Sequence, residues 1–208
     1  MSTAPVLRHS GRLRCPGRQV LARLGQVVLC CGALLACSPA VRAGGLEAGD
    51  RTVTAHTRDG QALVLGTLSL SEAGAGRWAY RLTLDTGKFT DHFLSMKEFK
   101  CLTGGSEVTC HVPYPYASPR TLSATDLGWL EHDLLWLYKL PREFGAKLWN
   151  GLIFTLRVTD QGLVGTPQAV DLNLISSPPA RLDVAPLRPA LRDDIAPGTR
   201  WIESISIR

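Results

Sequence analysis

Residues 99–116, FKCLTGGSEVTCHVPYPY, are the most tightly constrained part of the sequence, because two cysteines flank a short turn. If Gly105 and Ser106 form a two-residue hairpin loop, with glycine first as in a type II′ turn, Cys101 lies directly opposite Cys110. The same register places the apolar residues two positions outside each cysteine on the cysteines' face. A redox pair more often has CxxC spacing, and structural zinc needs four ligands. The segment therefore predicts a β-hairpin with a cross-strand disulfide, formed in an oxidising compartment.

The first 43 residues have the three-part pattern of a bacterial secretory signal peptide. Five arginines between Arg8 and Arg23 form a basic start with no acidic residue, and an apolar run follows over residues 27–37. That run is too short to span a bilayer as a helix. Val41–Ala43 then offers the small-x-small pattern of a cleavage site. We predict cleavage after Ala43 and a periplasmic or secreted mature chain, residues 44–208.

A lipoprotein is the alternative at this end of the chain. Leu34–Cys37, LLAC, resembles the lipobox of bacterial lipoproteins, whose cysteine becomes the lipidated first residue. Leu35 is bulky for its place in that pattern, so cleavage after Ala43 is preferred. Peripheral membrane contact is expected only if Cys37 is lipidated, because no apolar run after residue 43 is long enough to cross a bilayer.

Removal of the signal peptide changes the charge balance and the cysteine count. The whole chain has 23 basic and 18 acidic residues, and residues 1–43 contain six arginines and no acid. The mature chain then has 17 basic and 18 acidic residues, a net charge of −1 with neutral histidines. Nucleic acid is therefore not a predicted partner. Cys101 and Cys110 are the only cysteines left, an even pair.

Most of the mature sequence alternates apolar and polar residues, which is the pattern of antiparallel strands with one buried face. Two of the expected strands flank Asp59-Gly60, a strong hairpin signal, and another turns back at residues 160–162. Residues 176–200 are rich in proline and are expected to be extended along the surface. Besides the cysteine hairpin, the clearest strands cover residues 51–57, 62–70, 77–85, 152–159 and 201–208.

A helical pattern interrupts the strands at residues 123–150. Leucines recur at helical spacing over residues 123–139, and residues 141–150 begin with a proline and end at Asn150-Gly151, a helix-stop sequence. The predicted fold is α+β, mainly β: a curved antiparallel sheet or small β-barrel of about eight strands with an inserted helix pair. Residues 44–208 are expected to form one domain.

The sequence contains no familiar catalytic motif, and no metal or cofactor is predicted. His92, His111 and His132 are the candidate acid–base or metal-binding residues, and Asp91 and Glu131 adjoin two of them. Their spacing matches no metal-ligand pattern. The alternative function is therefore an exported hydrolase-like or metal-dependent enzyme that uses these three histidines.

Aromatic residues give the preferred function. Trp129, His132 and Trp136 form a stripe beside the leucines, so the predicted helix is apolar over more than one face. In one interpretation both faces are buried in the core. In the other, the stripe lines a ligand pocket that Tyr114 and Tyr116 close. These five are the candidate ligand-binding residues of an exported, non-enzymatic binding or accessory module. It would hold an unknown small apolar or aromatic ligand, or a protein partner, between its sheet and its helices.

Overall fold

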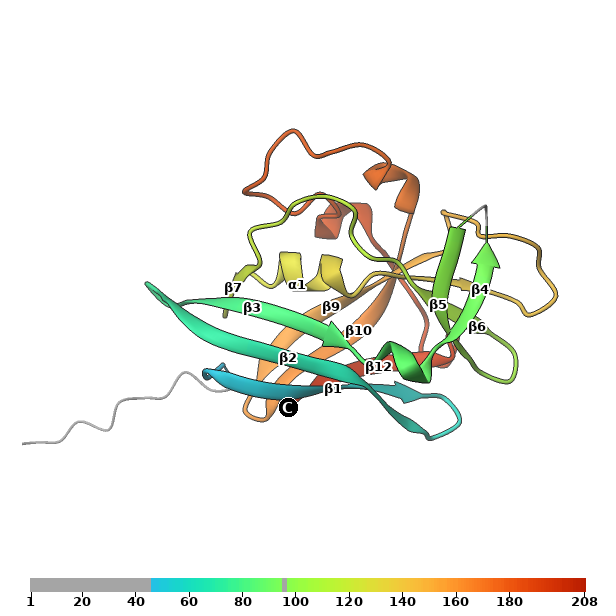
Figure 1. Cartoon of the computed structure of the whole chain (residues 1–208), viewed down its shortest axis with the longest axis horizontal. Coiled ribbons are helices and arrows are strands. Elements are labelled where there is room, and N and C mark those ends of the chain that lie inside the picture. Colours follow the sequence, from blue (N-terminus) through green and yellow to red (C-terminus); the bar gives the residue numbers. More distant parts are fainter. Residues whose placement is uncertain (1–45, 95–96) are drawn as a thin grey trace, which may run out of the picture. The chain divides into compact units, whose positions relative to one another are not determined.

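The computed structural model describes residues 46–94 and 97–208. The predicted signal peptide, the cleavage position after Ala43 and the alternative lipidation at Cys37 lie outside these residues. Within them the chain forms one antiparallel sheet of 12 strands and one α-helix (Figure 1). The spatial order of the strands is β4-β5-β6-β8-β9-β10-β12-β1-β2-β3-β7, and β11 pairs with β10.

The elements follow one another along the chain with mostly short connections. The strands of the first half are β1 (Gly49–Thr57), β2 (Ala62–Gly74), β3 (Arg77–Leu84), β4 (Thr90–Leu94), β5 (Lys97–Thr103), β6 (Val108–His111) and β7 (Thr121–Ser123). The second half contains α1 (Gly128–Asp133), β8 (Trp136–Lys139), β9 (Gly151–Thr159), β10 (Gly162–Val170), β11 (Asp193–Asp194) and β12 (Ile202–Ile207). Three short 3-10 helices complete the fold: η1 (Thr86–Lys88), η2 (Leu172–Ile175) and η3 (Pro189–Leu191).

The predicted fold class is wrong in two respects. The sheet is open and has 12 strands, where a curved sheet or small barrel of about eight was expected. The expected helix pair at residues 123–150 is reduced, in the described chain, to the six-residue helix α1. Residues 136–139 of the first expected helix instead form β8, which pairs with β6 and β9. Strand pairing with distant segments has overridden the local helical pattern.

The cysteine hairpin has the predicted register. Cys101 of β5 lies opposite Cys110 of β6, and the two are joined by a disulfide with a Cα–Cα distance of 3.9 Å. Backbone hydrogen bonds between Gly104 and Glu107 leave a two-residue loop, as expected. The loop is not a type II′ turn, however, because Gly105 does not have the positive φ that this turn requires.

Trp201, just before β12, connects the turn of this hairpin to a distant part of the sheet. In the strand order, β8, β9 and β10 separate β6 from β12. A Cβ atom added to Gly104 would nevertheless lie 2.2 Å from Cδ2 of the Trp201 indole. The indole N–H also donates to Asp59, in the β1–β2 turn, at 3.2 Å. The sheet therefore curls enough to bring both turns onto one tryptophan.

The core has two parts, on opposite sides of the middle strands. Along β9, Leu152 and Phe154 pack into the larger cluster, and Ile153 packs into the cluster that surrounds the disulfide. The side chains of β8 also point to both sides, because Trp136 packs into the larger cluster and Leu137 into the disulfide cluster. Burial on both faces explains why these strands are apolar almost throughout. The helix of the described region is not long and apolar enough to cross a membrane.

The disulfide is expected to stabilise the fold by restricting the unfolded chain. Replacing both cysteines, as Cys101→Ala with Cys110→Ala, should lower the free energy of unfolding by about 2–3 kcal/mol, the chain-entropy estimate for so short a loop. Urea denaturation of the variant and of the oxidised protein measures the difference. An unchanged midpoint, or two free thiols in the native oxidised protein by mass spectrometry, would contradict the account.

Candidate functional site

Four of the five candidate ligand-binding residues lie together. The ring of Tyr114 is 5.7 Å from that of Tyr116, 5.9 Å from that of Trp129 and 5.5 Å from that of His132, measured between centroids. Trp129 and His132 are buried, with 2% and 0% of their surface exposed. Their packing is that of core residues, and their role in ligand binding stays a prediction.

Trp136, the fifth candidate, belongs to a separate aromatic group. Its ring stacks on Phe89 at 6.0 Å and meets the edge of His111 at 5.3 Å. The side chain is fully buried, because Trp136 lies on β8 in the middle of the sheet and not on a helix face. The predicted stripe is therefore divided between two neighbouring elements.

His132 joins α1 to the proline-rich segment. Its Nδ1 donates to the carbonyl of Gly128 at 2.7 Å, and its Nε2 accepts from the backbone N–H of Leu187 at 2.9 Å. Burial lowers the pKa of His132 to about 4. The imidazole is thus neutral, and both of its nitrogens are occupied by the backbone.

Glu131, the preceding residue, anchors the same segment through its carboxylate. One oxygen accepts from the N–H of Leu156 in β9 at 2.8 Å, and the other pairs with Arg192 at 2.7 Å. The Arg192 guanidinium also donates to the carbonyl of Leu187 and to Thr155, each at 2.9 Å. A pocket of about 360 Å³ borders this network, but its buried polar groups already satisfy one another.

A pocket of about 330 Å³ lies beside the aromatic group around Tyr114. We call it the connector pocket, because residues 112–120, which connect β6 to β7, contribute to one side of it. Its apolar wall combines side chains of β3 with the first residues of the connector. The lining residues are Leu82, Leu84, Thr86, Lys100, His111, Pro113, Tyr114, Arg120 and Asp133.

Asp133, the last residue of α1, organises the inner side of this pocket. Its carboxylate accepts a hydrogen bond from the Tyr80 hydroxyl at 2.9 Å, and its backbone carbonyl accepts one from His111 Nε2 at 3.0 Å. Burial raises the pKa of the Asp133 carboxyl and lowers that of His111. Burial likewise raises the pKa of Tyr80, so the phenol keeps its proton.

Two cations lie on the outer side of the connector pocket. Lys100 is paired with Asp91 and lies 3.9 Å from Glu98. Arg120 makes no side-chain hydrogen bond or ion pair with the described residues. Its charge nevertheless acts on Asp133, where it opposes the rise in pKa caused by burial. Arg120 is also one of two described non-glycine residues with positive φ, at 48°.

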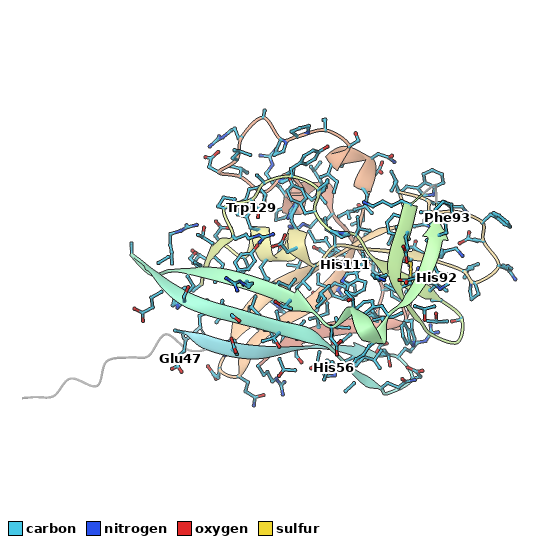
Figure 2. All side chains as sticks on the ribbon, in the orientation of Figure 1. Glu47, His56, His92, Phe93, His111 and Trp129 are labelled. Atoms are coloured by element: carbon cyan, nitrogen blue, oxygen red, sulfur yellow. A yellow bond between two sulfur atoms is a disulfide. The ribbon has the colours of Figure 1, made fainter. Side chains whose placement is uncertain are left out.

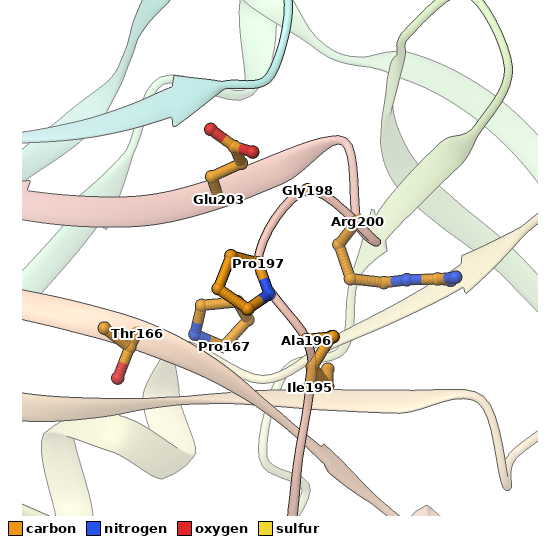
Figure 3. A pocket seen from close by; sticks show the side chains of 8 residues that line it. All are labelled: Thr166, Pro167, Ile195, Ala196, Pro197, Gly198, Arg200 and Glu203. Carbon is orange, nitrogen blue, oxygen red and sulfur yellow. The ribbon is translucent and has the colours of Figure 1, made fainter.

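Figure 3 shows another pocket, of about 230 Å³, between β10 and the segment that leads into β12. Pro167 and Pro197 are among the residues that line it. Arg200 extends away from the pocket, towards Glu107 at 3.2 Å and the Tyr138 ring at 3.7 Å. This pocket therefore lacks the converging polar groups that the connector pocket has.

The candidate histidines do not form a metal site. Figure 2 shows His92 on the outer hairpin strand and His111 nearer the middle of the sheet. His132 lies on α1, with both nitrogens engaged. Within residues 46–94 and 97–208, no group of three or more His, Cys, Asp or Glu residues is arranged to hold a metal ion.

Comparison with protein-family models, with curated proteins and with solved structures finds no match. Function must therefore be argued from the site itself. Tyr114 is the one candidate ligand-binding residue of the sequence analysis that lines this pocket, and Leu82 and Leu84 lie in the predicted strand at residues 77–85. No sequence pattern indicated Arg120 or Asp133, whose neighbours come from distant strands.

The burial of His132 predicts a pH effect on stability. The folded protein holds this group neutral, with a pKa of about 4 in place of the ordinary 6.5, so protonation favours the unfolded chain. The contribution of neutral His132 to the free energy of unfolding is fully present above pH 6.5. It is lost as the pH falls towards 4, at up to about 1.4 kcal/mol per pH unit.

Urea denaturation of wild type and of His132→Asn across this pH range isolates the effect. The difference in free energy of unfolding between the two proteins should shrink steadily as the pH is lowered. A constant difference would show that His132 does not titrate on unfolding in this range.

Proposed function

We propose that this protein is an exported, non-enzymatic binding module that holds a small ligand with an apolar or aromatic body in the connector pocket. The observation that carries the proposal is the make-up of that pocket. Leu82, Leu84, Pro113 and the ring of Tyr114 give it apolar walls, and a few polar groups converge on them. Concave apolar sites with a small number of placed polar groups are the usual form of small-ligand sites.

Two observations support export. The buried disulfide between Cys101 and Cys110 is typical of proteins that fold in an oxidising compartment. The first 43 residues have the composition of a signal peptide. We therefore propose a periplasmic or secreted protein, and retain the lipoprotein anchored through Cys37 as the alternative.

The alternative occupant is a protein partner, as in an accessory module. The loop between β8 and β9 favours it, because Phe144 is fully exposed and Trp149 is 62% exposed. Large exposed aromatic side chains are common at protein interfaces. An enzyme using His92, His111 and His132 is the less supported alternative, since the backbone occupies both nitrogens of His132.

Filling the pocket tests the proposal. The probe is N-phenylnaphthylamine, a neutral aromatic compound whose fluorescence rises in apolar surroundings. Leu84→Trp places a larger side chain in the apolar wall and should weaken probe binding by about tenfold or more, because the bound ring needs that space.

Leu191→Trp is the matched control, since Leu191 is 43% exposed and lies outside the connector pocket. It should bind the probe as wild type does. Thermal melting establishes that both variants are folded. If folded Leu84→Trp retains wild-type affinity, or wild type does not bind the probe, the connector pocket is not the binding site.

A further inference from the structure

We infer that the ligand of the connector pocket carries an anionic, acceptor-rich group, such as a carboxylate or sulfonate, which Arg120 binds. This inference rests on the proposed function, because it specifies the chemistry of a ligand held at that same site. Some polar groups of the pocket already have partners, and others do not.

The charged residues in the lining of the pocket differ in whether they have a hydrogen-bond or ion-pair partner. Lys100 is neutralised by Asp91 and Glu98. The Asp133 carboxylate accepts a hydrogen bond from Tyr80. Arg120 alone among these three charged lining residues has no hydrogen bond or ion pair with the described side chains. A guanidinium presents a planar fork of donors that matches a carboxylate or sulfonate.

Buried polar atoms without partners are also donors. The Tyr114 hydroxyl and the Trp136 indole N–H are both buried and lack a hydrogen-bond partner among the described residues. An indole N–H can only donate, whereas a hydroxyl can donate or accept. Buried polar groups in proteins are normally hydrogen-bonded, so an unmatched one needs an explanation.

Of these two residues, Tyr114 lines the connector pocket. Trp136 is fully buried and contacts the lining residue His111, with the two ring centroids 5.3 Å apart. His111 Nε2 in turn donates to the carbonyl of Asp133. The Tyr114 hydroxyl, which can donate, and the Arg120 guanidinium together favour a ligand that supplies acceptor atoms.

The backbone holds Arg120 in position. The carbonyl of Arg120 accepts from the N–H of Tyr80 in β3 at 2.9 Å. With a φ of 48°, the residue lies in the left-handed region, which non-glycine residues seldom occupy. Strained positions of this kind are concentrated at binding and catalytic sites.

A matched pair of probes separates this inference from the proposed function. Anilinonaphthalene sulfonate and N-phenylnaphthylamine have the same aromatic body, but only the first carries an anionic group. Wild type should bind the anionic probe about tenfold more tightly, the size expected of a hydrogen-bonded charge pair. Arg120→Gln should remove this preference and leave binding of the neutral probe unchanged.

Three further variants give the test a direction and a control. Arg157→Gln, an exposed arginine of β9 outside the pocket, should keep the wild-type preference. Asp133→Asn keeps an acceptor for Tyr80 but removes a negative charge, so it should tighten binding of the anionic probe alone. Arg120→Lys, which keeps the charge and not the fork, should retain part of the preference.

Each remaining outcome has one meaning. If wild type binds both probes equally, or folded Arg120→Gln keeps the preference, the inference is wrong and the proposed function stands. If wild type binds neither probe, both are wrong. Thermal melting of each variant shows whether a change in binding is separable from unfolding.

Discussion

A buried ion pair between Glu131 and Arg192 joins α1, β9 and the proline-rich segment. Both side chains are almost wholly buried, with 7% and 3% of their surface exposed. Removing one partner of such a pair typically costs about 3–5 kcal/mol, because the other charge is left uncompensated. The remaining hydrogen bonds of the pair reach β9 through Leu156 and Thr155. One short helix, one central strand and the C-terminal segment are thereby joined at a single point.

The connector pocket follows from this arrangement. Glu131 is bonded to β9 and His132 to Leu187, and the next residue, Asp133, ends the short helix α1 beside them. Asp133 then bonds Tyr80 with its carboxylate and His111 with its carbonyl. These contacts set β3 against the hairpin that carries the disulfide, and the space between them is the pocket. Part of the lining of the pocket, Leu82, Leu84 and Tyr114, therefore packs against the larger core cluster.

The sequence could predict what depends on local spacing. The register of Cys101 and Cys110 is fixed by a two-residue loop and by the period of a strand, and both can be read directly. The helix pair could not be excluded in the same way, because the apolar residues around Leu134 and Leu137 suit a helix as well as a buried strand. Only pairing with β6 and β9 decides between them. Arg120 and Asp133 have no local signal, since their significance comes from Tyr80 and His111, which are far away in the sequence.

A crystal structure of the protein with anilinonaphthalene sulfonate would show where an apolar anion binds. The aromatic rings of the bound probe should lie between Leu84 and Tyr114. One of its sulfonate oxygens should lie within about 2.7–3.2 Å of a guanidinium nitrogen of Arg120. A probe seated beside Pro197 or against Trp149 with the connector pocket empty would contradict the account. A probe in the connector pocket with its sulfonate turned away from Arg120 would retain the site and overturn the anion-binding role.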